Sequence, residues 1–193
     1  MAGAAQNREP LIALERVSHT FSQARGRELQ VLKNISVSIY EGEIVAFLGP
    51  SGCGKTTTLK ILSGLLQPTE GLVFDHGKQL KGVNVHIGMV FQSFALLPWY
   101  TVEQNTALGL SVHQFTQRQI KIRVNEAIEK AGLGGFEEAY PKELSGGMRQ
   151  RVGIGRALAV KPEVLCLDEA FSALDAFTAE NLRAEVINIW QEK

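Results

Sequence analysis

The sequence predicts an α/β fold with a β-rich start, a strand–loop–helix unit, a helical insertion and a return to the sheet. Three observations support this order. Apolar and polar residues alternate over residues 11–17 and 31–40, an apolar run at 44–48 ends in a glycine-rich loop, and helix signals dominate residues 98–133. The 193 residues are enough for one sizeable core.

The alternation over residues 11–17 and 31–40 has a period of two, which predicts half-solvated, mostly antiparallel strands. Residues 23–27 between them predict a turn or loop, and the small, polar residues 1–10 are expected to form a disordered tail. On the second strand one face is predicted to carry the following residues: Val31, Lys33, Ile35, Val37 and Ile39.

Two further strands are predicted from apolar runs. Residues 44–48 and 164–167 are continuously apolar, as expected for strands buried on both faces, and the second run leads into Asp168. Residues 83–91 alternate again as a strand. Leucines at helical spacing predict a helix over residues 56–66.

Residues 98–133 are predicted to be helical. Thr101 and Thr116 are each followed three residues later by glutamine, the pattern of a capping box. After Thr116, one apolar stripe is interpreted as core packing and ends at Gly132. The stripe consists of Ile120, Val124, Ala127 and Ile128.

The composition restricts the class of partner. Twenty Lys and Arg residues balance twenty Asp and Glu residues, so no net field attracts nucleic acid or an anionic membrane, although local basic patches remain compatible with it. Two cysteines, Cys53 and Cys166, do not suggest a disulfide framework and fit a reducing, cytoplasmic setting. No apolar run approaches the ~18 residues of a membrane span. Any membrane association is therefore expected to come through a partner protein.

Residues 49–56 fit the phosphate-loop pattern G-x-x-x-x-G-K-[ST] between a predicted strand and a predicted helix. Glycines allow the backbone to approach an anion closely, and the start of the helix adds partial positive charge. Lys55 is then expected to contact the β- and γ-phosphates, and the Thr56 hydroxyl to bind Mg²⁺. The alternative is a chance glycine-rich turn.

The acidic pair Asp168–Glu169 follows a predicted buried strand. Beside a phosphate loop, Asp168 is expected to hold Mg²⁺ through water, and Glu169 to polarise the water that attacks the γ-phosphate. The alternative is a pair of acidic residues that simply ends a strand at the surface.

A second glycine-rich segment, residues 144–151, predicts a second anion site. Ser145 is expected to cap the start of a helix. Gly146 and Gly147 follow it and carry no side chains, so they leave the first backbone amides of that helix uncovered. One chain does not need two γ-phosphate sites, which suggests a site shared between two chains. A plain capped helix is the alternative, and the spacing alone does not decide between them.

Residues 144–151 resemble the signature of ATP-binding-cassette (ABC) ATPases, and the other motifs follow in that family's order from about residue 11 to the end. The resemblance implies that residues 11–193 form a P-loop NTPase (RecA-like) core with an antiparallel β subdomain and a helical subdomain at about residues 95–160. This fold is expected to be incomplete at the C-terminus. Residues 49–57 match Walker A, 164–169 match Walker B, and 172–175 match the D-loop.

The resemblance also implies the roles of single residues. Phe21 matches the aromatic residue that stacks on adenine, and Gln92 matches the glutamine that reaches Mg²⁺ and the attacking water. Glu169 and Gln92 are the implied catalytic residues, and Thr56, Gln92 and Asp168 the implied Mg²⁺ ligands. The implied ATP-binding residues are Phe21, Gly49, Pro50, Ser51, Gly52, Cys53, Gly54, Lys55, Thr56, Thr57, Ser145, Gly146, Gly147 and Asp175.

Within this family, residues 91–105 and 140–148 resemble importer subunits for nitrate, sulfonate and taurine, and residues 177–183 support that subgroup. The resemblance implies an ATPase beneath a transmembrane permease, on the cytoplasmic face of the bacterial membrane. It further implies that the chain forms a homodimer when nucleotide binds. A periplasmic or lipid-anchored solute-binding protein is implied as an indirect partner, and nucleic acid is not an implied partner. The apolar stretch 94–99 is expected to form part of the permease-coupling surface, with an ordinary buried loop as the alternative.

The sequence departs from the family pattern in several places. Ala170 replaces the usual proline after Glu169, and two glycines interrupt the helix after the signature. All four histidines precede Walker B, so the switch-histidine region and at least one strand are expected to be missing at the C-terminus. This raises the alternative of a truncated ATP-binding remnant with little or no hydrolysis. A soluble ABC ATPase of DNA repair or translation is disfavoured by the single cassette, the lack of heptads and the zero net charge.

Overall fold

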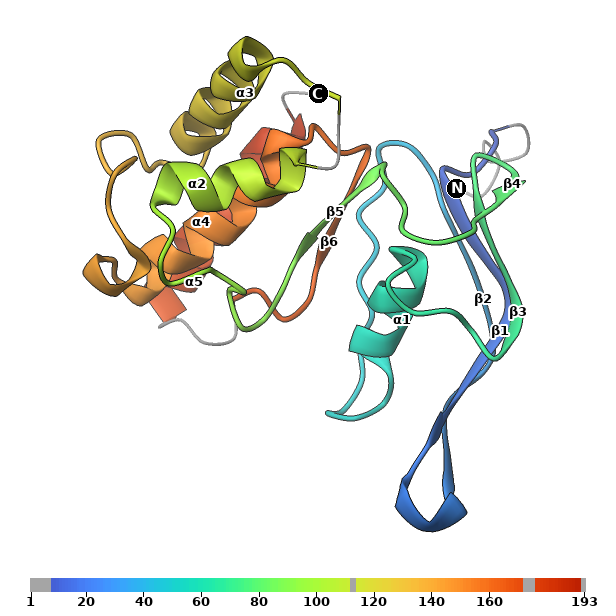
Figure 1. Cartoon of the computed structure of the whole chain (residues 1–193). Helices are drawn as coiled ribbons and strands as arrows, with labels where there is room; N and C mark the ends of the chain where they lie inside the picture. Colours follow the sequence, from blue (N-terminus) through green and yellow to red (C-terminus); the bar gives the residue numbers. More distant parts are fainter. Residues whose placement is uncertain (1–7, 112–113, 172–175, 192–193) are drawn as a thin grey trace. The chain divides into compact units, whose positions relative to one another are not determined.

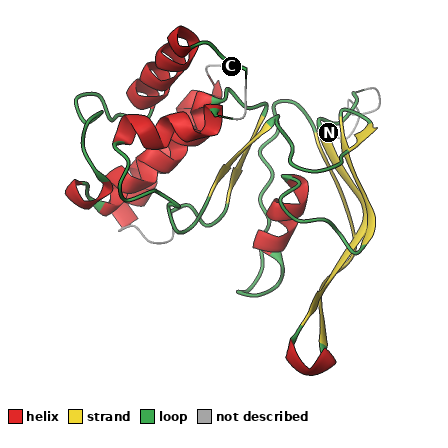
Figure 2. Ribbon diagram, viewed as in Figure 1, coloured by secondary structure: helices red, strands yellow, loops and turns green. Residues whose placement is uncertain are grey.

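The structure is a computed structural model that describes residues 8–111, 114–171 and 176–191, so most of the expected tail 1–10 lies outside the described residues. The chain forms two compact units, residues 1–87 and 88–193. Figure 1 traces the chain from end to end, and Figure 2 shows that the first unit is mainly strand and the second mainly helix.

The first unit is built on a four-stranded antiparallel sheet with the order β2-β1-β3-β4. The long hairpin of β1 and β2, closed by the short 3-10 helix η1, confirms the predicted antiparallel strands and the turn between them (Figure 1). The strands are β1 (Ile12–Ser22), β2 (Glu28–Ile39), β3 (Glu70–Asp75) and β4 (Lys78–Gln79), and η1 spans Ala24–Gly26.

The predicted apolar face of β2 is wrong at its first residues. Val17 of β1 pairs with Ile35, and His19 pairs with Leu32, so β2 carries one residue more than β1 over this stretch. Asn34 lies in this bulge with φ +50. A bulge shifts the alternation by one residue. Leu32 is therefore buried, whereas Lys33 is exposed.

Helix α1 (Lys55–Leu62) contacts β1 and β2, and buries Ile61 and Leu62. It ends four residues before the predicted end, because Gly64 has φ +70 and the chain packs tightly there against the backbone of Gly82. A side chain at position 64 would collide with that backbone.

Of two further strand predictions, one is wrong and the other is confirmed over part of its length. Residues 44–48 form no strand; Leu48 is 92% exposed. A strand buried on both faces needs neighbours that pair with its backbone, and within the described residues of the first unit no strand pairs with 44–48. The strand predicted over 83–91 is reduced to β5 (Ile87–Val90), because the Asn84 side chain accepts a hydrogen bond from His86 N and fixes a loop instead.

The second unit combines the two-stranded sheet of β5 and β6 (Val164–Leu167) with a group of helices. Strand β6 confirms the predicted second apolar strand. The helices are α2 (Val102–Ala107), η2 (Leu108–Leu110), α3 (Gln117–Lys130), η3 (Pro141–Glu143), α4 (Gly146–Ala159) and α5 (Ala176–Gln191).

Helix α4 packs against α2 and α3 around an apolar core. Thr101 and Thr116 form the predicted capping boxes at the starts of α2 and α3. Val124, Ala127 and Ile128 are buried in this core and Ile120 packs against it, which confirms the stripe as core packing. Among the described residues, no helix has the length and apolar character needed to cross a membrane.

Candidate functional site

The phosphate loop closes around the side chain of its lysine. Gly54 caps α1 with φ +100, and Lys55 is the first residue of the helix. The Lys55 ammonium donates hydrogen bonds to the carbonyl oxygens of Gly49 at 3.0 Å and Pro50 at 3.2 Å. The ammonium therefore lies at the centre of the loop, where it can meet an anion bound by the loop amides.

The base of the loop is tightly packed. A Cβ atom added to Gly54 would lie 2.6 Å from Leu32 Cδ2 on β2, so only glycine fits there. The Gly54 carbonyl accepts hydrogen bonds from Thr58 N at 2.8 Å and Thr58 Oγ1 at 3.0 Å, which fixes the first turn of α1. The remaining loop residues are accessible: Ser51, Gly52 and Cys53 are exposed, and Thr56 and Thr57 are half-buried.

Phe21 lies near the end of β1 in the same unit. Its side chain is 39% exposed, and its ring meets the buried His19 ring edge to face, with centroids 4.5 Å apart. The contact orients the Phe21 ring while leaving part of it accessible, as an aromatic residue that stacks on a base requires.

In the second unit the chain segments that follow β5 and β6 bring two predicted catalytic residues together. Gln92 Nε2 donates a 3.2 Å hydrogen bond to Glu169 Oε2, although the two residues are 77 positions apart. Asp168 is 5% exposed, and its backbone N–H donates to Val90 O at 3.0 Å. The backbone hydrogen bond between Val90 and Asp168, at the ends of β5 and β6, thus helps to position the side chains of Gln92, Asp168 and Glu169.

Glu169 adopts a left-handed backbone conformation with φ +46, a region that non-glycine residues rarely occupy. Ala170 is 4% exposed and packs in the cluster that contains Val90 and Ile154. Proline restricts the residue before it, so alanine leaves Glu169 free of that restriction. Strain at a single residue of this kind is typical of functional sites.

The signature segment begins helix α4. The Ser145 hydroxyl accepts a hydrogen bond from Met148 N at 3.2 Å, which confirms the predicted N-cap. Arg149 donates to Leu144 O at 2.7 Å and braces the chain just before the cap. Gly146 and Gly147 form the first turn and add no side chain over its amides, as a site for an anion would need.

Arg156 is a further residue of this unit that the sequence analysis missed. Its guanidinium donates to Ala95 O at 2.6 Å and to Phe94 O at 2.9 Å, and burial lowers its pKa. Phe94 and Ala95 both have positive φ, at 58° and 48°. Arg156 therefore connects α4 to the segment that follows Gln92. A charged residue in the middle of an otherwise apolar helix turn is the signal that could have found it.

The sequence model of the ABC transporter family matches residues 32–172. The chain belongs to this family. It is 46% identical over 87% of its length to an uncharacterised ABC transporter ATP-binding protein of Methanocaldococcus jannaschii, covering 63% of that protein. It is 48% identical over 87% of its length to the aliphatic sulfonates import ATP-binding protein of Bacillus subtilis (strain 168), covering 65%. It is 41% identical over 94% of its length to the taurine import ATP-binding protein of Ruegeria pomeroyi, covering 68%.

Solved ABC cassettes share the fold. A dimeric ATP-binding cassette in a post-hydrolysis state with ADP and Pi matches with a TM-score of 0.82 and 33% identity, over 94% of this chain and 83% of that chain. The predicted fold class and the predicted resemblance to sulfonate and taurine importer subunits are confirmed. The chain spans about two thirds of the length of the three relatives above.

The ABC motifs are divided between the two units. The phosphate loop and Phe21 belong to the first unit, and Gln92, Asp168, Glu169 and Ser145 belong to the second. Within its own unit each group has the local geometry described above. Asp175 and the rest of the D-loop lie outside the described residues.

Proposed function

We propose that this chain is the ATP-binding subunit of an importer for a small anion such as a sulfonate, taurine or nitrate. The observation that carries the proposal is the Lys55 ammonium at the centre of an intact phosphate loop. The names of the sulfonate and taurine relatives support the transport role.

ATP binding is proposed to begin at the phosphate loop. The loop amides and the start of α1 hold the phosphates, and Lys55 turns from its two carbonyl partners toward the β- and γ-oxygens. Phe21 stacks on the adenine ring. The accessible residues 51–53 leave the backbone open to the triphosphate.

Each unit contributes its own proposed Mg²⁺ ligands, Thr56 in the first unit and Gln92 and Asp168 in the second. They offer a hydroxyl, an amide oxygen and a carboxylate, the hard oxygen donors that Mg²⁺ prefers. Gln92 directs its amide nitrogen to Glu169, so the amide oxygen is the atom that suits a metal. When bound, Mg²⁺ neutralises charge on the β- and γ-phosphates.

Glu169 is proposed as the group that polarises the attacking water, and Gln92 as the residue that positions it. The hydrogen bond between them orients the Glu169 carboxylate, which is proposed to accept a proton from the attacking water. The buried Asp168 next to it in the chain keeps the backbone anchored to β5.

The signature segment is proposed to act on the ATP of a second copy of the chain. The capped helix start, with Ser145 exposed and two glycines after it, offers donors for the γ-phosphate of a partner. The solved relative described above is a dimer, which supports this arrangement. We propose a homodimer that forms on nucleotide.

A transmembrane permease is the proposed second partner. Binding to it would place the chain on the inner face of the membrane, and a solute-binding protein is proposed as an indirect partner. Within residues 94–99, Leu96 packs against the helical core whereas Trp99 is 67% exposed. Leu96 therefore anchors the segment, while Trp99 presents a large apolar side chain to solvent, as a docking surface for the permease requires.

The proposal is tested by the Lys55→Ala variant, with Lys60→Ala as a matched control on the exposed face of the same helix. Lys55→Ala should abolish measurable ATP binding in a fluorescent-nucleotide titration, because the charge at the phosphates is lost. Lys60→Ala should bind ATP like the wild type. Equal affinity in both variants would reject the phosphate-loop assignment, and binding by the wild type without hydrolysis would favour the remnant alternative.

A further inference from the structure

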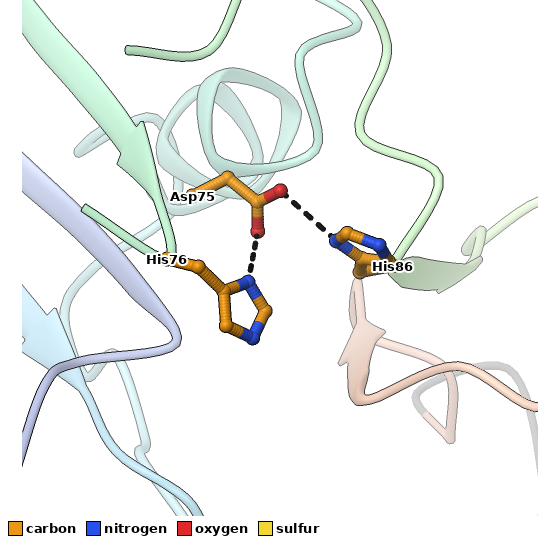
Figure 3. Close-up of side chains that lie close together, drawn as sticks. All are labelled: Asp75, His76 and His86. Atoms are coloured by element: carbon orange, nitrogen blue, oxygen red, sulfur yellow. Dashed lines mark hydrogen bonds and ion pairs between the residues drawn. The ribbon is translucent and has the colours of Figure 1, made fainter. Parts of the chain in front are cut away.

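Three side chains outside the nucleotide-binding motifs gather in the first unit. Asp75 ends β3, His76 lies in the tight turn between β3 and β4, and His86 lies just before β5 (Figure 3). The cluster plays no part in the function proposed above. Its ligand atoms all lie within 4.8 Å of one another.

The backbone holds the first two of these residues in place. The two-residue turn has φ +46 at His76 and +67 at Gly77, which suits a tight hairpin, and Asp75 pairs with Lys78 across it. His76 N donates to Leu11 O at 2.9 Å, which ties the turn to the start of β1.

His86 is fixed by the loop that precedes it. Asn84 N donates to Ser63 O at 2.9 Å, at the end of α1, and the Asn84 side-chain oxygen accepts from His86 N at 2.9 Å. The cluster is therefore built on anchored backbone and not on a loose loop.

The side chains converge on one carboxylate. His76 Nδ1 lies 3.0 Å from Asp75 Oδ1, and His86 Nδ1 lies 2.9 Å from Asp75 Oδ2, so each oxygen faces one imidazole (Figure 3). The two imidazole rings meet edge to face, with centroids 5.3 Å apart. Both histidine side chains are 41% exposed, so water reaches the cluster.

Asp75 is kept ionised by its neighbours. Burial alone would raise its pKa, but the hydrogen bonds of His76 and His86 outweigh burial and hold the pKa below its ordinary value. The Asn84 side chain also lowers the pKa of Asp75. Asn84 itself is 3% exposed, so this contact is shielded from water.

We propose that Asp75, His76 and His86 bind one divalent transition-metal ion of the Zn²⁺ class, with water completing its coordination. Two imidazoles and a carboxylate suit Zn²⁺, Co²⁺ or Ni²⁺, whereas Mg²⁺ and Ca²⁺ prefer oxygen ligands alone. Three protein ligands and an open position form a known class of zinc site.

The ligand atoms lie near the spacing that this ion needs. Zinc–ligand bonds of about 2.0–2.2 Å in tetrahedral geometry place neighbouring ligand atoms roughly 3.3–3.6 Å apart. One ligand atom of each of the three residues lies within 4.8 Å of the others, and the two N–O pairs are 2.9 and 3.0 Å apart. Because the two imidazoles face different oxygens of the carboxylate, small side-chain rotations are needed to gather the three ligand atoms around one ion. When the metal binds, each neutral imidazole carries its single proton on Nε2, because the ligating Nδ1 must be unprotonated.

The test is a Zn²⁺ titration of the full chain by calorimetry, without nucleotide, in a Cys53→Ser background that removes the exposed thiol. We expect one equivalent bound at the cluster. In the His76→Ala/His86→Ala variant the affinity should fall by more than about tenfold, the smallest loss typical of damage to a metal site. Glu28→Gln, which changes an exposed carboxylate on β2 of the same unit, is the control and should leave the affinity unchanged.

Co²⁺ gives a second readout that does not depend on the stability of the variants. The wild-type chain with Co²⁺ should show visible d–d bands of a site with nitrogen and oxygen ligands, and Zn²⁺ should displace them. No Zn²⁺ binding by the wild type, or full binding by the double variant, would overturn the proposal and leave the cluster a hydrogen-bonded His–Asp–His group.

Discussion

The side-chain amide of Gln92 donates a 3.2 Å hydrogen bond to the carboxylate of Glu169. Two segments far apart in the chain, one after β5 and one after β6, are thereby joined at the carboxylate that we propose to act on water. The same carboxylate stands on a backbone with φ +46, so its position depends on the contacts around it.

Glu169→Gln is expected to bind ATP normally but to hydrolyse it about 10²–10⁴-fold more slowly, because a positioned general base contributes about that much. ATP-bound dimers should persist longer in this variant. Phosphate release and size-exclusion chromatography with ATP measure the two effects. Glu138→Gln, which changes an exposed carboxylate elsewhere in the unit, is the control. Equal turnover in the wild type and Glu169→Gln would remove Glu169 from this role.

Arg156→Lys is expected to slow hydrolysis while ATP affinity stays near that of the wild type. The guanidinium holds the carbonyl oxygens of Phe94 and Ala95, just after Gln92, through two separate nitrogens. A lysine carries its donors on a single atom and lacks this planar fork, so it should hold the two carbonyls less firmly. Arg151→Lys is the matched control, because Arg151 lies on the same helix and donates to Ala131 O at 3.2 Å. Each variant should lose about 1–3 kcal/mol of unfolding free energy.

The kinetic difference between these two variants is the decisive measurement. If Arg151→Lys slows hydrolysis as much as Arg156→Lys, the effect comes from general loss of stability and not from the segment after Gln92. Unchanged hydrolysis in Arg156→Lys would show that the carbonyl contacts do not position Gln92.

The sequence predicted the elements whose signals are local. The capping boxes at Thr101 and Thr116, the N-cap at Ser145 and the buried strand before Asp168 all depend on residues close in the chain, and the structure confirms them. Helix caps act through neighbouring amides, so a short pattern is enough to find them.

The failures have non-local causes. The bulge at Asn34 shifts the face of β2, and its cause is the pairing with β1. Residues 44–48 were predicted as a buried strand because they are continuously apolar. Apolar composition alone does not predict whether a neighbouring strand is present to pair with their backbone. The Asp75, His76 and His86 cluster escaped notice because a turn and a distant loop bring it together.

Asn105 on α2 is a buried polar residue whose role the sequence pattern did not predict. It is fully buried; its side-chain oxygen accepts from Leu97 N at 2.9 Å. Its amide nitrogen donates to Leu97 O, Tyr100 O and Thr101 O at 2.9–3.1 Å. One side chain therefore satisfies the backbone of the loop before α2.

Asn105→Ala should lose roughly 2–4 kcal/mol of unfolding free energy, because several backbone groups are left without partners. The midpoint of urea unfolding, followed by circular dichroism, measures the loss. The control is Gln104→Ala on the same helix, which removes a partner of the capping box at Thr101 and should cost only about 1 kcal/mol. A smaller loss for Asn105→Ala than for this control would contradict the role assigned to Asn105.

The two cysteines differ in exposure and reactivity, so chemical labelling of the wild-type chain can test whether ATP binds at the phosphate loop. Cys53 is exposed in the loop, whereas Cys166 on β6 is buried and burial raises its pKa to about 12. At pH 8 only about one Cys166 thiol in ten thousand is ionised, and the thiolate is the reactive form. Iodoacetamide should therefore label Cys53 and spare Cys166 in the folded chain, as mass spectrometry of peptides would show.

Labelling of Cys53 should abolish ATP binding, and ATP should protect Cys53 from the reagent. The Cys53 sulfur lies against Gly49, since a Cβ atom added there would come within 2.6 Å of Sγ. An added carboxamidomethyl group would therefore occupy the mouth of the loop, where the phosphates are proposed to bind. Cys53→Ser treated with the same reagent is the control and should keep its ATP affinity. If ATP does not slow the labelling of Cys53 in the wild type, the nucleotide does not bind at this loop.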